Sequence, residues 1–139
     1  MSQEDVEVVC RAHAEFLDGL SRGDHAASFD AGTVASDFEW ILPADAPGLK
    51  RVYRGRAGFL DFMRTWTEDF EWSIELEQAI DVGDGRVVVR TRQQATGKGS
   101  GVPVELVMGG LWTVENGQAT RAENFFDPAD ALEAAGLSE

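Results

Sequence analysis

The sequence has little basic charge and only one cysteine. Twelve Lys and Arg residues stand against twenty-five Asp and Glu residues, which gives a formal net charge of −13 at pH 7. This excess of negative charge repels phosphate backbones and anionic lipid surfaces, so neither nucleic acid nor membrane is expected as a partner. Cys10 has no second cysteine with which to form an intramolecular disulfide.

Targeting segments and long apolar runs are also missing. The first five residues contain no basic region that leads into an apolar stretch, so we expect no secretion signal and a cytoplasmic protein. The hydrophobic fraction of 43% and the charged fraction of 27% are typical of an ordinary globular domain. The length of 139 residues fits one domain over residues 1–139.

The residues that hold metals or act as nucleophiles have the wrong spacing here. His13 and His25 are predicted on different helices, with no nearby thiolate or His-Glu pair, so no metal and no cofactor is expected. Ser100 lies in the segment Gly-Lys-Gly-Ser-Gly between two predicted strands. That segment matches neither a nucleophile elbow nor a phosphate-binding loop.

The spacing of apolar residues predicts four helices. Residues 3–22 carry an apolar stripe at intervals of three and four, and a short helix is predicted near residues 25–29. A third helix follows Gly55, because Phe59, Phe62, Met63 and Trp66 fall on one face. Asp127 and Pro128 are typical of a helix start, which predicts a terminal helix ending at Gly136.

Strands are predicted in the intervening and following segments. Residues 37–42 alternate before Pro43, and residues 70–81 alternate strictly between apolar and polar positions. Three further strands are predicted over residues 86–96, 102–115 and 118–126, the last two joined by an Asn116-Gly117 turn. Helices followed by four antiparallel strands predict an α+β fold in which a curved sheet wraps around the N-terminal helices.

The carboxylates and the polar residues on apolar faces are the candidates for chemistry. The glutamates of residues 71–77 share the solvent face of their strand, and Glu105 and Glu123 are expected to pair with Arg90, Arg92 or Arg121. Glu39 is either a surface residue or a pocket acid, and its phase favours the surface. His13 and Asn124 are the two catalytic candidates, although a histidine on an apolar stripe is more often a core residue.

The order of these pieces resembles the SnoaL-like branch of the NTF2-like superfamily over nearly the whole chain. The matching segments are Leu20-Ser21-Arg22-Gly23-Asp24, Asp37-Phe38-Glu39-Trp40, Tyr53-Arg54-Gly55-Arg56, Leu111-Trp112-Thr113-Val114, Arg121-Ala122-Glu123 and Asp127 ahead of Ala131-Leu132-Glu133. The resemblance implies a cone-shaped α+β barrel with an apolar cavity, and a homodimer packed through the convex face of the sheet.

The resemblance also implies which residues line the cavity. The expected lining consists of Phe16, Trp40, Leu42, Phe59, Phe62, Met63, Trp66, Val107, Gly109, Leu111, Asn124 and Phe126, with Ala122 beside them. On the same register Leu106, Met108 and Trp112 point to the convex face. They form the expected homodimer contact, because such a patch would otherwise be exposed.

Two functions stay open on this evidence. One is a non-catalytic pocket protein that binds a small apolar molecule; the other is an isomerase, polyketide cyclase or epoxide hydrolase that uses His13 or Asn124. The groups used by the ketosteroid isomerases of the superfamily fall at Phe16, Leu42 and Gly109, so all three are missing. Ketosteroid isomerase activity is therefore not expected, since its chemistry needs a positioned carboxylate and hydrogen-bond donors.

Overall fold

The computed structural model describes residues 2–44, 46 and 49–137, and it has the expected α+β architecture. The helices are α1 (Ser2–Arg22), α2 (Ala27–Asp30), α3 (Gly55–Trp66) and α4 (Pro128–Ala134). The strands are β1 (Val34–Ile41), β2 (Val52–Arg54), β3 (Phe70–Gly83), β4 (Arg86–Gly97), β5 (Pro103–Glu115) and β6 (Gln118–Phe125). The short strand β2 was not predicted. Its three residues are too few to show alternation.

The strands form one sheet in the order β2-β1-β6-β5-β4-β3. The four strands β3 to β6 are antiparallel neighbours, as predicted. Strand β1 differs, because it pairs in parallel with β6 while β2 pairs antiparallel with β1. The sheet is therefore mixed rather than purely antiparallel. The parallel pair brings the N-terminal half of the chain alongside its C-terminal strand.

Local sequence signals account for the turns and for the ends of α4. Asn116 and Gly117 have φ angles of 53° and 78°, which confirms the tight hairpin predicted between β5 and β6. Asp127 accepts a hydrogen bond from the Ala129 N–H, and Pro128 occupies the first turn of α4. In β3 a bulge between Leu76 and Gln78 interrupts the strict alternation seen before it.

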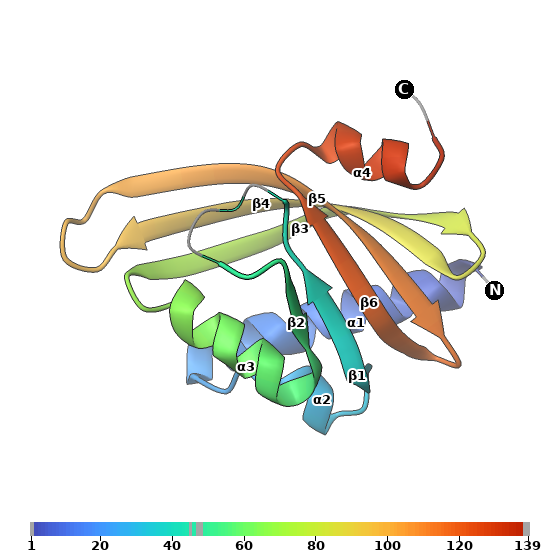
Figure 1. Ribbon diagram of the computed structural model, residues 1–139, viewed down its shortest axis with the longest axis horizontal. Helices are drawn as coiled ribbons and strands as arrows, with labels where there is room; N and C mark the ends of the chain where they lie inside the picture. Colours follow the sequence, from blue (N-terminus) through green and yellow to red (C-terminus); the bar gives the residue numbers. More distant parts are fainter. Residues whose placement is uncertain (1, 45, 47–48, 138–139) are drawn as a thin grey trace.

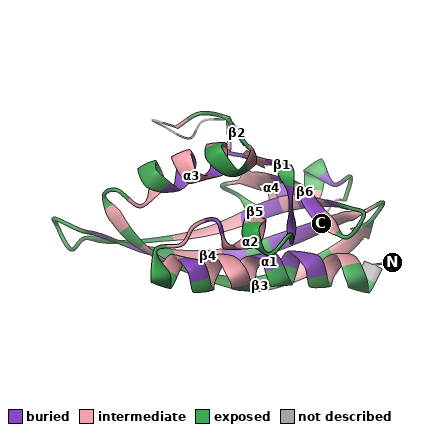
Figure 2. Ribbon diagram, turned by 90° about the horizontal axis from the view of Figure 1, so that it is seen from below, coloured by how far each residue is buried: buried purple, intermediate pink, exposed green. Residues whose placement is uncertain are grey.

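Helices cover both faces of the sheet, but unequally. Helices α1, α2 and α3 lie on one face, and α4 lies on the other (Figure 1). One buried cluster joins α1 to the sheet and includes Val9, Phe38, Val87 and Trp112. A second lies under α3, and a third holds α4 against Val88. Figure 2 shows the buried residues gathered between α1, α3 and the strands, with the outer side of α1 exposed.

Within the described residues, no helix has both the length and the apolar character needed to cross a bilayer.

Candidate functional site

A cavity of about 110 Å³ lies between α1, α3 and the concave face of the sheet. It is partly open to solvent and predominantly apolar. Its lining residues come from all the layers that meet there: Ala12, His13, Phe16, His25, Ser28, Phe29, Val34, Phe38, Trp40, Leu42, Phe59, Phe62, Trp66, Ile74, Val89, Thr91, Gln93, Met108, Gly109, Trp112 and Asn124. Among the described residues, no Asp, Glu, Lys or Arg contributes to this lining.

The aromatic wall of the cavity contains most of the residues that the sequence singled out. Phe16, Trp40, Leu42, Phe59, Phe62 and Trp66 all line it, as do Gly109 and Asn124. Most of these rings contact one another at edge-on or tilted angles, as Trp40 and Phe59 do with centroids 5.6 Å apart at 88°, whereas Phe62 and Trp66 are stacked. Such aromatic contacts fix the wall in place.

The register predicted for β5 is wrong by one residue. Met108 and Trp112 face the cavity, and Trp112 is only 5% exposed within the core. Leu111 packs on the opposite face against the cluster under α4, and Val107 is outside the cavity lining. The error exchanged the two faces of the strand because side chains alternate with a period of two. Leu106, Met108 and Trp112 therefore do not form an exposed convex patch.

Three further predicted lining residues lie elsewhere. Met63 is fully buried in the cluster under α3 and does not reach the cavity. Phe126 is 45% exposed just beyond the end of β6. Ala122 is buried in the core between α1 and the sheet. The helical stripe that placed Met63 could not distinguish the core side of α3 from its cavity side.

The close approach of α4, rather than the cavity, explains why position 109 is a glycine. A Cβ atom there would lie 2.8 Å from the Pro128 Cα and 3.0 Å from the Ala131 Cβ. The backbone of α4 therefore crosses β5 too closely for any side chain at this position. A carboxylate at position 109 would point into α4, away from the cavity.

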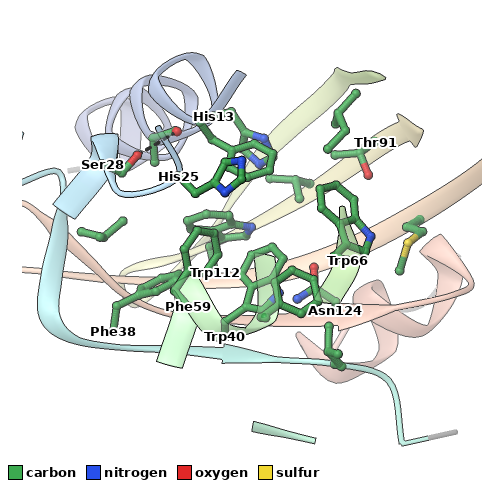
Figure 3. Close-up of a pocket in the computed structure, with 18 of the residues that line it drawn as sticks. His13, His25, Ser28, Phe38, Trp40, Phe59, Trp66, Thr91, Trp112 and Asn124 are labelled. Atoms are coloured by element: carbon green, nitrogen blue, oxygen red, sulfur yellow. Dashed lines mark hydrogen bonds between the residues drawn. The ribbon is translucent and has the colours of Figure 1, made fainter. Parts of the chain in front are cut away.

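His13 lies on α1 and points into the cavity, with its ring 5.3 Å from that of Trp112 (Figure 3). Part of the side chain borders the cavity, but both ring nitrogens are inaccessible to solvent and have no hydrogen-bond partner among the described residues. This desolvation lowers the pKa of the His13 imidazole from 6.5 to about 4. His13 is therefore neutral at neutral pH, with one nitrogen able to donate and the other able to accept.

Trp40 on β1 presents a second unpaired group. Its indole Nε1–H is buried and has no acceptor in the described part of the chain. Asn124 on β6 is anchored instead, because its Nδ2 donates to the backbone oxygen of Ile41 at 2.8 Å. Its side-chain amide therefore has a fixed orientation at the cavity wall (Figure 3).

Several lining residues were not predicted, and His25 is the most notable. The chain turns back sharply after α1, where a Cβ on Gly19 would lie 2.0 Å from the backbone oxygen of Asp24. This close return carries His25 and Ser28 to the cavity that already holds His13. The two imidazoles come from separate elements, so sequence spacing gave no signal. No cluster of three or more metal-ligating side chains occurs among the described residues.

The convex face of the sheet is polar where α4 does not cover it. Glu77 accepts hydrogen bonds from Arg90 at 3.1 Å and from Arg92 at 2.8 Å, and these bonds lower the pKa of the Glu77 carboxyl. Arg92 also reaches Glu105 at 3.4 Å, which confirms the predicted cross-strand pairing. Glu39 pairs with Arg54 at 2.6 Å, so it is a surface residue and not a pocket acid.

Comparison with known proteins identifies the fold of this site. A family model for the SnoaL-like domain matches residues 13–122. No curated protein matches the chain. Among solved structures, TerC co-crystallised with polyporic acid is 23% identical with a TM-score of 0.73, and the match covers 96% of this chain and 98% of TerC.

Two other solved structures are similar to this chain over most of its length. An NTF2-like protein from Burkholderia pseudomallei is 24% identical with a TM-score of 0.71, covering 96% of this chain and 97% of the other. An NTF2-like protein from Anabaena variabilis is 17% identical with a TM-score of 0.73, covering 91% and 92%. At these identities the likeness shows a shared fold alone.

Proposed function

This chain belongs to the SnoaL-like domain family, and from that premise we propose that its cavity binds a small, planar and largely apolar molecule. One observation carries the proposal: His13 and Trp40 line the cavity, and their buried side-chain nitrogens have no hydrogen-bond partner in the described part of the chain. Buried polar groups nearly always find partners, because an unpaired one costs about 1–3 kcal/mol. A ligand that supplied the missing hydrogen bonds would recover that free energy on binding.

The shape and composition of the wall favour a ring-shaped ligand. An apolar cavity of 150 Å³ accommodates benzene, so a cavity of about 110 Å³ suits a ligand built around a single ring. The aromatic residues Trp40, Phe62 and Trp66 border the space, and Trp66 is stacked on Trp72 behind it with the ring centroids 4.3 Å apart.

Binding fits the site better than proton transfer does. General acid-base catalysis works best when the pKa of the catalytic group is near the working pH. The His13 pKa of about 4 is well below neutrality, and no carboxylate among the described residues lines the cavity. Catalysis of an isomerase, cyclase or hydrolase type by His13 or Asn124 stays the alternative prediction, with the anchored Asn124 amide as its main support.

Calorimetric titration with phenol tests the proposal. We expect saturable binding to the wild-type protein and to Gly99→Ala, a control outside the cavity lining where an added Cβ meets nothing within 4 Å. Trp40→Phe should bind more weakly, because it removes the unpaired indole donor while keeping an aromatic ring. Absence of saturable heat with both phenol and hydroquinone would contradict the proposal.

A homodimer is part of the proposal, with a changed contact surface. Trp112 is buried and Met108 faces the cavity, so neither can form the contact between two copies, and the proposed contact lies elsewhere on the convex face. We expect a dimer in sedimentation velocity at micromolar concentration that weakens at high salt. A 15.2 kDa species at all salt concentrations would contradict this.

A cytoplasmic location is proposed on the sequence evidence, together with the free and exposed Cys10.

A further inference from the structure

The charges around the cavity separate sharply into two zones. The outer surface of the protein carries most of its 37 ionisable acidic and basic residues, 25 acidic and 12 basic, and several of them form ion pairs. The cavity wall contains no Asp, Glu, Lys or Arg among the described residues. A charged ligand that entered the cavity would therefore lose its hydration without gaining a permanently charged partner in the wall.

Among the residues that the structure describes, two histidines are the titratable groups that line this space. His13 comes from α1, and His25 comes from the segment between α1 and α2. Among the described residues, the polar groups that line the cavity from the other elements are uncharged: Ser28 from α2, Trp40 from β1, Trp66 from α3, Thr91 and Gln93 from β4, Trp112 from β5 and Asn124 from β6. Figure 3 shows His13, His25, Trp40 and Asn124 pointing inward from different elements.

The unpaired groups define what the ligand must offer. The Trp40 indole can only donate, so it requires an acceptor such as a hydroxyl, carbonyl or nitro oxygen. A neutral His13 can donate through one nitrogen and accept through the other, so a hydroxyl group can serve as its partner. An anionic oxygen could satisfy the indole, but its charge would be desolvated beside an apolar, uncharged wall.

We propose that the cavity selects the uncharged form of a hydroxylated aromatic ligand and excludes the corresponding anion, with Trp40 and His13 as the specificity-determining residues. This inference rests on the proposed function and names the ligand class. Such a cavity would differ from an oxyanion-binding site, which stabilises a negatively charged oxygen. Because Trp40 and His13 are buried hydrogen-bonding groups, the cavity would recognise the protonation state of the ligand as well as its shape.

4-Nitrophenol is a suitable probe, because its phenolate absorbs visible light and its neutral form absorbs in the near ultraviolet. At a pH equal to the pKa of the free probe, we expect added protein to reduce the visible absorbance as the neutral form is bound. Affinity measured well below that pKa should exceed affinity well above it by at least about tenfold. Nitrobenzene, which cannot ionise, should bind with the same affinity at both pH values.

The net charge of −13 could also repel an anion from outside the cavity. High salt separates the two causes, because about 1 M salt reduces the screening length to roughly 3 Å. We expect the preference for neutral 4-nitrophenol to persist at that salt concentration. A preference that disappears there would assign the effect to the protein surface and overturn the inference.

Two cavity variants and one control sharpen the test. Gln93→Lys places a cation at the wall and should raise the affinity for the phenolate while leaving nitrobenzene binding nearly unchanged. His13→Phe should weaken neutral 4-nitrophenol binding more than nitrobenzene binding, because it removes both nitrogens but keeps a ring beside Trp112. Glu77→Gln, on the convex face, should change neither the affinity for nitrobenzene nor the preference for neutral 4-nitrophenol over its phenolate.

The outcomes separate this inference from the proposed function. Two results would overturn the neutral-form inference alone. In the first, nitrobenzene binds and both forms of 4-nitrophenol bind equally well. In the second, the visible absorbance of 4-nitrophenol increases on binding. Failure of both nitrobenzene and 4-nitrophenol to bind would overturn the inference and count against the ligand-binding proposal as well.

Discussion

The two faces of the same sheet treat their polar groups in opposite ways. On the convex face Glu77 bonds to both Arg90 and Arg92, and Arg92 also pairs with Glu105. On the concave side the nitrogens of His13 and Trp40 have no partner in the described residues. The Glu15 Oε1 atom on α1 is also buried and unpaired among the described residues, but Glu15 lies outside the cavity lining. The nitrogens of His13 and Trp40 belong to residues that line the cavity, where a ligand could reach them.

The largest expected effect of this difference is on stability against acid. His13 has a pKa of about 4 in the folded protein and 6.5 when unfolded, so the unfolded chain binds more protons between these values. Stability is therefore full above pH 6.5 and is lost as pH falls towards 4, by about 3 kcal/mol in all. Urea denaturation of wild type and His13→Phe across this range measures it.

In that experiment the carboxylates supply a background common to both proteins. The difference between wild type and His13→Phe should therefore change by about 3 kcal/mol over the window. A difference that is constant with pH would mean that His13 is not desolvated in the folded protein.

The next effect concerns the contact of α4 with the convex face. Gly109→Ala places a Cβ 2.8 Å from the Pro128 Cα, so α4 must shift. Overpacking of this kind costs about 2 kcal/mol in the free energy of unfolding. Gly99→Ala is the matched control, since a Cβ there meets nothing within 4 Å. Equal stability of the two variants would show that α4 is not held against β5 as described.

A smaller effect is expected from removing the unpaired nitrogens without a pH change. At about pH 8, where His13 is neutral, His13→Phe should raise the free energy of unfolding of the empty protein by about 1 kcal/mol. The same substitution should weaken phenol binding. A gain in stability accompanied by a loss of binding is typical of residues kept for function. A loss of stability would instead indicate that the imidazole supports the core.

The smallest effect is expected on the convex face. Glu77→Gln removes the negative charge and one of the two acceptor oxygens that face Arg90 and Arg92, but the arginines are partly exposed and can bond to water. Exposed ion pairs contribute little and are screened by salt. Thermal unfolding of this variant should therefore differ slightly from wild type in low salt and not at all in high salt. A large loss would reverse the comparison between the two faces.

The sequence predicted the elements with strong local signals and missed those that depend on distant contacts. The alternation of residues 70–76 and the Asn116-Gly117 turn each contain their own evidence. The register of β5 has no such local signal, because Val107 and Leu111 are as apolar as Met108 and Trp112. Only the packing of α4 on the outer face distinguishes the two sets.

The candidate site was predictable in its aromatic wall but not in its polar groups. Phe59, Phe62 and Trp66 lie on one helical face that any apolar pocket or core would use. His25 reaches the cavity only because the chain returns closely at Gly19. The lack of partners for His13 and Trp40 is a property of the folded arrangement, which residue spacing cannot reveal.

The most direct test follows the Trp40 indole N–H itself by nitrogen-15 NMR. Its resonance can be assigned as the indole signal absent from Trp40→Phe. On addition of 4-nitrophenol the unpaired N–H is expected to move downfield and exchange more slowly with solvent, as it donates to the probe. An indole signal that stays in place while calorimetry shows the probe bound would contradict the role given to the unpaired groups of the cavity.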